Sequence, residues 1–180
     1  MTLTIRLATA ADLPAMTALM DRAIDELQRP FLSPAEIAAS HAVMGLDTRL
    51  VADGTYYVVE ESGALAGCGG WSRRATLYGG DHSTSLRDDR LLDPAHEPAR
   101  VRAMYTHPDF ARRGVGRLIL ESCEAAAAAQ GFARAELMGT MAGEPLYRAC
   151  GYKAIERIRS ADVDGVSVPL VRMGKTLASR

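Results

Sequence analysis

The feature that most constrains this chain is a change of hydrophobic period around residues 104–116 (MYTHPDFARRGVG). The residues before it alternate in polarity, which predicts a strand over residues 99–105. One face of this strand would carry Val101, Ala103 and Tyr105, and the other Arg102 and Met104. Further on, apolar residues recur at helical spacing, at Val115, Leu118, Ile119, Ser122, Cys123 and Ala126. The pattern predicts a strand, a break at residues 107–109 and a helix.

The junction between this strand and helix contains two glycines, in the run RRGVGR at residues 112–117. Glycine lets backbone amides come close to a ligand, and the first amides of a helix have no partner within it. Such amides lie at the positive end of the helix dipole and suit a phosphate or pyrophosphate. A simple tight turn would leave the same pattern. A Walker motif would need a following Lys, and a Rossmann motif a third glycine where Ile119 stands.

A longer pattern is more specific. A strand, then HPDFARRGVGRLIL at residues 107–120, then LYRACGY at residues 146–152, resembles the GNAT superfamily of N-acetyltransferases. The order of elements fits this family over nearly the whole chain. The resemblance implies a mixed α+β acyl-CoA N-acyltransferase fold. Its central sheet would be twisted and mostly antiparallel, with six to seven strands, about four flanking helices and two central strands that diverge.

The resemblance also implies acetyl-CoA as co-substrate. In the family, the motif R/Q-x-x-G-x-G/A binds the pyrophosphate, which here points to Arg112, Arg113, Gly114, Val115, Gly116 and Arg117. The pantetheine arm would pair with the backbone near Met104, Tyr105 and Thr106, where an amide also polarises the thioester carbonyl. Ala111 replaces the motif's usual first residue, which matters little where the contacts are mainly backbone. Thr140 would supply the polar contact that relatives often take from an Asn at the position of Ala142.

Tyr147 is the expected catalytic acid, because it matches the tyrosine of the family pattern F-Y-x-x-x-G-F/Y. The leaving thiol has a reference pKa of about 8.5 and tyrosine one of about 10, so proton transfer to sulfur is feasible. A tyrosine on a short helix is otherwise typical of a packed aromatic. Many relatives carry a Glu on the strand that here holds Met104 and Tyr105. Glu97 and Glu60 are the bases that this sequence offers, acting through water.

The acceptor-binding residues are expected in two irregular stretches. Phe31 lies in a linker between two predicted helices, and in the family this helix pair borders the acceptor site. Residues 72–98 form the least regular part of the chain, and long loops in compact domains are often functional. We expect this loop to cover the acceptor; a mobile surface loop is the alternative. Together with Trp71, at the end of the strand predicted before the loop, these stretches give the candidate contacts Phe31, Arg73, Arg74, Tyr78, Asp81 and Glu97.

The remaining elements follow from local signals. Strands are predicted at residues 3–7, 55–60, 65–71, 133–138 and 166–173, with Pro169 suited to an irregular or edge position. Gly67, Gly69 and Gly70 imply close approach of a neighbour or ligand. Thr9-x-x-Asp12 and Ser33-Pro34-Ala35-Glu36 are helix starts. The glycine-led helix should end at Gly131, and a short helix is expected over residues 143–150.

Composition sets the outer limits. With 180 residues, 48% of them hydrophobic, the chain can bury one sizeable core, so we expect a single domain over residues 1–180. A formal net charge of -1 predicts no general attraction to nucleic acid or anionic membranes. The N-terminus resembles no signal peptide, and no apolar run reaches the roughly 18 residues of a membrane span. We therefore expect a cytoplasmic protein.

The cysteines and histidines predict neither disulfides nor a metal site. Cys68, Cys123 and Cys150 are widely spaced and odd in number, and their neighbours favour buried small hydrophobic roles. The four histidines are scattered without zinc-ligand spacing, so no metal is expected.

The sequence therefore predicts an N-acetyltransferase. It would transfer the acetyl group of acetyl-CoA to a primary amine of a small molecule or a peptide, by direct attack in a ternary complex. A non-catalytic acyl-CoA-binding sensor or scaffold is the alternative. A nucleotide-binding protein of another fold is disfavoured by the missing lysine and third glycine. The resemblance allows a homodimer.

Overall fold

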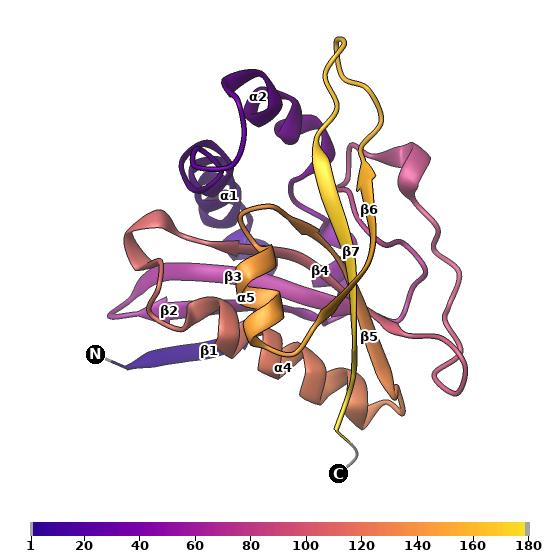
Figure 1. Ribbon diagram of the computed structural model, residues 1–180. Helices are drawn as coiled ribbons and strands as arrows, with labels where there is room; N and C mark the ends of the chain where they lie inside the picture. Colours follow the sequence, from indigo (N-terminus) through magenta and orange to yellow (C-terminus); the bar gives the residue numbers. More distant parts are fainter. Residues whose placement is uncertain (1, 179–180) are drawn as a thin grey trace.

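The computed structural model describes residues 2–178, which contain one seven-stranded sheet in the order β1-β2-β3-β4-β5-β7-β6 (Figure 1). Each neighbouring pair is antiparallel except β4 and β5, which are parallel. The strands are β1 Leu3–Leu7, β2 Tyr56–Glu61, β3 Ala64–Ser72, β4 Ala99–Thr106, β5 Arg134–Thr140, β6 Lys153–Arg159 and β7 Pro169–Thr176. The predicted mixed fold with a mostly antiparallel sheet is confirmed.

The helices of the described chain are α1 Leu13–Leu27, α2 Pro34–Val43, α3 Thr48–Ala52, α4 Val115–Ala129 and α5 Glu144–Ala149. Both predicted helix starts are present, and each has a capping box. Thr9 and Asp12 cap a short 3-10 helix, η1 Ala10–Asp12, that leads into α1, and Ser33 and Glu36 cap α2. The prediction missed α3, which is five residues long and begins after Asp47, whose carboxylate accepts from Arg49 N.

The helices cover both faces of the sheet (Figure 1). Residues of α1 pack with Val58 and Cys68, and residues of α4 pack with Val59 and Ala66, so the two helices lie on opposite faces of β2 and β3. The glycines of β3 bring α4 close: a Cβ at Gly67 would collide with Val115, and one at Gly69 would lie 2.8 Å from Ile119 Cγ2. The predicted close approach is therefore that of a helix.

The sheet opens between β4 and β5. These strands pair only at Ala99↔Ala135 and Arg100↔Glu136, although β4 continues to Thr106 and β5 to Thr140. At the last paired position, Glu136 Oε2 accepts hydrogen bonds from Arg100 Nη1 at 3.0 Å and Arg172 Nη2 at 2.6 Å. This charged cluster joins β4, β5 and β7 at the point where β4 and β5 begin to diverge. The two predicted diverging central strands are confirmed.

The predicted alternation of β4 is wrong beyond Arg102. Between Gly70↔Arg102 and Cys68↔Tyr105, β4 contains one residue more than β3. This β-bulge places Ala103 at a φ of 50°, and Tyr56 Oη donates to Ala103 O at 2.6 Å. Because one extra residue reverses the side-chain faces, Val101 packs in the core beside α4 and Tyr105 in the core beside α1.

The last strand also differs from its prediction. β7 begins at Pro169 rather than residue 166 and lies inside the sheet, between β5 and β6. An edge position for Pro169 is therefore wrong. Pro169 is the first residue of the strand, opposite Arg159, where the missing amide interrupts little of the ladder.

The irregular stretch before β4 forms a long loop whose ends run side by side. We call residues 73–92 the strap. At its base, Ala75 N donates to Arg90 O at 2.9 Å and Leu92 N to Arg73 O at 2.7 Å. Thr76 exchanges side-chain and backbone hydrogen bonds with Asp88. The predicted irregularity is confirmed, but the loop is closed by internal hydrogen bonds.

Candidate active site

A cavity of about 710 Å³ lies where β4 and β5 part. Elements on both faces of the sheet line it. One side, which we call the loop side, comes from the end of β5, the loop before α4, the start of α4 and α5, and it includes Arg112, Gly114, Gly116, Thr140 and Leu146. The other side, which we call the chamber, comes from the ends of α1 and α2 and from the strap and includes Ile24, Leu27, Phe31, Met44, Leu77 and Tyr78.

The loop side presents a run of unpartnered backbone amides. Within residues 2–178, none of the amides of residues 112–117 donates a hydrogen bond; the first bond of α4 runs from Leu118 N to Gly114 O, at 3.0 Å. Two residues in the left-handed region shape the loop, Arg112 at a φ of 66° and Gly114 at 86°. Arg112 pays a conformational cost of about 1–2 kcal/mol there, and such strain is typical of functional loops.

The three arginines of this loop are arranged differently. Arg112 and Arg117 line the cavity. Arg113 instead donates to the buried carboxylate of Glu61 at 2.7 Å, and its guanidinium lies 5.5 Å from the ring centre of Phe110. Arg113 therefore braces the loop through its side chain.

Tyr147 of α5 lines the same cavity and is 8% exposed. Its ring packs against Gly139 and Gly143, where a Cβ would lie 3.2 and 2.9 Å from ring carbons. Within the described residues its hydroxyl makes no hydrogen bond. Burial raises the pKa of this hydroxyl well above its ordinary value, with smaller contributions from Cys123 and Cys150. The hydroxyl is therefore protonated at neutral pH and is available as a donor.

The predicted contacts for the pantetheine arm also lie in the cavity wall. Met104, Tyr105, Thr106 and Thr140 all line it. Tyr105 Oη accepts from Gly45 N at 2.8 Å, which leaves the hydroxyl hydrogen free for a second partner. Thr140 Oγ1 accepts from Gly143 N at 3.1 Å. Beyond Arg100, the edge of β4 that faces β5 has no strand partner and is open to an extended ligand.

The residues predicted to contact the acceptor separate into two groups. Phe31, which is half exposed, and Tyr78 line the cavity. The other five do not. Trp71 is buried in the core against Phe132, with ring centres 6.1 Å apart. Asp81 accepts from Thr48 N at 3.0 Å and so fastens the strap to α3.

Arg73, Arg74 and Glu97 lie at the base of the strap. Arg74 donates to both carboxylate oxygens of Asp53, at 2.7 and 3.0 Å, and Arg73 donates to Gln130 Oε1 at 3.1 Å. Glu97 accepts from Arg90, which lowers the pKa of Glu97 to about 2, and this weakens it as a base. Glu60, the other base considered, is paired with Arg6 at 2.7 Å. The geometry gives these residues structural contacts.

Several lining residues were not identified from the sequence, among them Leu77, Arg102, Leu137 and Leu146. For Arg102 the only signal was general, because an arginine needs a partner when it is buried, and the predicted alternation of the strand did not indicate burial. Leu137, Leu77 and Leu146 carried no such signal. Their approach to the cavity depends on how the strands part.

Other site chemistries find little support. No group of three or more His, Cys, Asp and Glu residues within residues 2–178 is placed to hold a metal ion. Burial raises the pKa of the Cys68 thiol to about 12, as expected for an inert core cysteine. Across the same residues, none of the helices combines the length and the apolar character needed to cross a membrane.

Solved structures share this fold. A GCN5-related N-acetyltransferase from Rhodopseudomonas palustris matches with a TM-score of 0.70 and 19% identity, over 98% of this chain and 97% of the other. An N-acetyltransferase from Thermoplasma acidophilum in complex with coenzyme A matches at 0.64 and 13%, over 98% and 99%. The protein yncA from Salmonella typhimurium, with its cofactor acetyl-CoA, matches at 0.64 and 20%, over 100% and 96%.

A search of curated proteins gave no match to this chain. A family model, by contrast, matches residues 52–154, which include the open strands, the amide loop and Tyr147. Its description is "Acetyltransferase (GNAT) domain". The matched segment covers more than half of the chain, and the fold and the site geometry agree with it. The chain therefore belongs to the GNAT acetyltransferase family and is an acyltransferase.

Proposed function

We propose that this protein transfers the acetyl group of acetyl-CoA to a primary amine, by direct attack of the amine within a ternary complex. The observation that carries the proposal is the run of unpartnered amides over residues 112–117, in the same cavity as Tyr147. Two of the structural relatives contain coenzyme A or acetyl-CoA, which supports the choice of donor.

The loop side would hold the pyrophosphate of acetyl-CoA. Charge-assisted hydrogen bonds from backbone amides to phosphate oxygens are stronger than bonds between neutral groups, and the dipole of α4 adds to them. Arg112 and Arg117 can add positive charge from the side chains that line the cavity. The open edge of β4 would pair with the amide groups of the pantetheine arm, as an added strand pairs with a sheet edge.

The chemical step replaces the C–S bond at the thioester carbon with a C–N bond. The amine nitrogen attacks this carbon, the C–S bond breaks, and the sulfur leaves as a thiolate that takes a proton from Tyr147 Oη. The proton that the nitrogen loses finally restores the tyrosine. Because burial raises the pKa of Tyr147, this proton transfer is uphill by itself, and it is completed as the proton lost by the nitrogen returns to the tyrosine.

The amine must reach the thioester in its neutral form. For an alkylamine with a pKa of about 10, losing the proton at pH 7 costs about 4 kcal/mol. None of the described residues that line the cavity is Asp, Glu or His. The low polarity of the chamber itself favours the neutral amine, because burial penalises the charged form.

The experiment that tests this function measures release of free coenzyme A thiol from acetyl-CoA with a panel of primary amines. We expect thiol release that depends on the amine and saturates with both substrates. Calorimetric binding of acetyl-CoA is measured in parallel. If acetyl-CoA binds but no amine increases thiol release, acetyl transfer is contradicted, and the non-catalytic binding module predicted as the alternative is favoured.

A further inference from the structure

The wall of the chamber rests on a buried ion pair that the reaction itself does not use. Arg102 of β4 and Asp47, which precedes α3, have side chains that are 3% and 1% exposed, and Arg102 Nη2 donates to Asp47 Oδ2 at 2.8 Å. Asp47 Oδ1 also accepts from Arg49 N at 3.0 Å and lies 3.4 Å from Arg87 Nη2. The buried aspartate is thus held from β4, α3 and the strap.

Arg102 also contacts the strap backbone on both sides of the segment that lines the cavity. Its Nη2 donates to Gly79 O at 2.8 Å, and its Nη1 lies 3.4 Å from Thr76 O. These two carbonyls flank Leu77 and Tyr78, which are the strap side chains that line the chamber. A planar guanidinium can hold two such acceptors and a carboxylate at once, whereas an ammonium group has no fixed fork.

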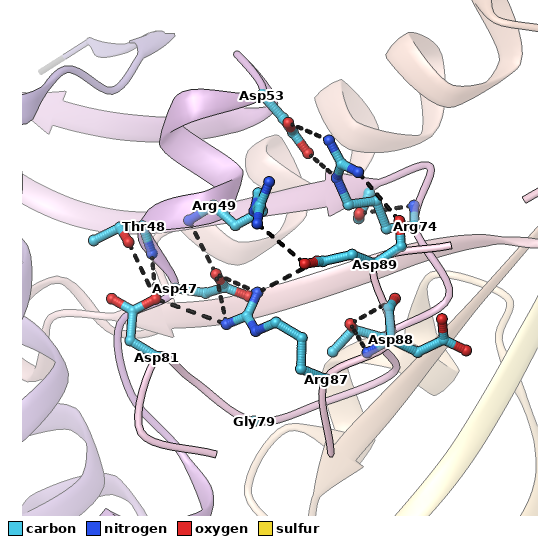
Figure 2. Close-up of polar contacts among 12 residues, drawn as sticks. Asp47, Thr48, Arg49, Asp53, Arg74, Gly79, Asp81, Arg87, Asp88 and Asp89 are labelled. Carbon is cyan, nitrogen blue, oxygen red and sulfur yellow. Dashed lines mark hydrogen bonds and ion pairs between the residues drawn. The ribbon is translucent and has the colours of Figure 1, made fainter. Parts of the chain in front are cut away.

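The rest of the strap is fastened mainly by contacts that do not involve Arg102, although Arg87 also binds Asp47. In Figure 2, Arg74 forms an ion pair with Asp53, and Asp81 accepts a hydrogen bond from Thr48. Asp89 lies between Arg49 and Arg87 and forms ion pairs with both. These contacts hold the base and the outer part of the strap and are more exposed than the Arg102–Asp47 pair. Thr76 is also held by Asp88, but Arg102 is the side chain that contacts the strap backbone on both sides of Leu77 and Tyr78.

The chamber that this wall closes is apolar. Phe31, Leu27 and Ile24 face it from the end of α1, and Met44 from the end of α2, opposite the strap residues Leu77 and Tyr78. Apart from the hydroxyl of Tyr78, the polar or charged side chains that line the chamber are Gln28 and Arg102, and Arg102 is neutralised by Asp47. A substrate with additional positive charges would lose hydration there without a carboxylate partner.

We propose that the acceptor is a primary amine with an apolar body, and that Arg102 is the positioning residue that holds the strap wall which selects it. The substrate class rests on the acetyl transfer proposed above. The role of Arg102 concerns binding in the chamber and can be measured without turnover.

The experiment compares binding of 2-phenylethylamine and spermidine to the protein saturated with coenzyme A, by calorimetry. We expect the wild-type protein to bind 2-phenylethylamine more tightly. Arg102→Lys keeps a positive charge near Asp47 but loses the hydrogen bonds to the carbonyls of Thr76 and Gly79. We therefore expect the Kd of this variant for 2-phenylethylamine to be at least about fivefold higher. In turnover assays the KM for the amine should rise, while kcat and the KM for acetyl-CoA stay unchanged.

Arg74→Lys is the matched control, because Arg74 also pairs with an aspartate and donates to a strap carbonyl, Asp89 O, but lies outside the cavity. It should leave amine binding unchanged. Tyr78→Ala removes the wall itself and should weaken amine binding even if Arg102→Lys folds poorly. Tighter binding of spermidine, or equal effects of the two lysine variants, would overturn the inference. Binding of 2-phenylethylamine without thiol release would contradict acetyl transfer and the acceptor class, and would leave only the role of Arg102 in the chamber wall standing.

Discussion

The two sides of the cavity are built from different parts of the chain. On the loop side, a ligand would meet consecutive backbone amides of residues 112–117, and the side chain of Arg113 serves only to brace the loop against Glu61. In the chamber, a ligand would meet side chains from α1, α2 and the strap, and a buried ion pair positions them. A site made of backbone tolerates changes of side chain, and a site made of side chains can change its specificity residue by residue.

Tyr147 is the residue that we propose as the acid, where the two substrates would meet, so we expect the largest effect there. Tyr147→Phe removes the hydroxyl that would face the leaving sulfur and should lower kcat at least about tenfold, while the Kd for acetyl-CoA is unchanged. Stopped-flow thiol release and calorimetry measure the two quantities. The control is Tyr57→Phe, a half-buried tyrosine of β2 outside the cavity. An unchanged kcat would remove Tyr147 from the acid role.

The next effect tests the loop side. Gly114 has a φ of 86°, and a Cβ there would touch nothing within 4 Å, so Gly114→Ala perturbs only the backbone. The left-handed conformation then costs about 1 kcal/mol, and relaxation of the loop would turn its amides away from the ligand. We expect acetyl-CoA to bind about fivefold more weakly by calorimetry, with the KM for the amine unchanged.

Gly165→Ala provides the control for that substitution. Gly165 has a φ of 83° and also has open space at its Cβ position, but it does not line the cavity. It should show the same loss of thermal stability without loss of acetyl-CoA affinity. Equal affinity losses in both variants would mean that general destabilisation, and not the amide loop, governs binding.

In the chamber, by contrast, a change of side chain should alter binding of the amine and leave binding of acetyl-CoA unchanged. Phe31→Ala removes apolar surface from the wall and should raise the KM for an apolar amine about threefold, with the Kd for acetyl-CoA unchanged. Leu91→Ala removes a large side chain of similar exposure, on the strap but outside the cavity, and should change neither constant. If Phe31→Ala weakens acetyl-CoA instead, the assignment of the two sides is reversed.

The smallest effect concerns pH. Burial raises the pKa of Tyr147 above its ordinary value of 10.0, so the hydroxyl stays protonated at every pH below that value. The contribution of the neutral Tyr147 hydroxyl to the folding stability is complete below pH 10 and is lost only as the pH rises further. The ratio of wild-type to Tyr147→Phe rates should therefore be constant from about pH 7 to about pH 9. A ratio that falls as the pH rises across this range would show ionisation of Tyr147.

The sequence by itself determined the loop side. Glycine spacing after a broken strand reports directly on backbone conformation, because few other residues adopt the left-handed angles or admit close neighbours. Local signals also predicted the helix starts at Thr9 and Ser33 and most strands. The role of Tyr147 rested on family resemblance, and the structure places its ring in the cavity wall.

Tertiary structure alone decided the chamber. The bulge at Ala103 depends on the register of β4 against β3, which local alternation does not contain, and it moves Tyr105 to the opposite face from Val101. Pairing of Arg102 with Asp47 joins residues far apart in the chain, so no spacing rule announces it. Arg74 and Tyr78 looked alike as loop candidates; only the folded strap placed one at its base and the other in the cavity.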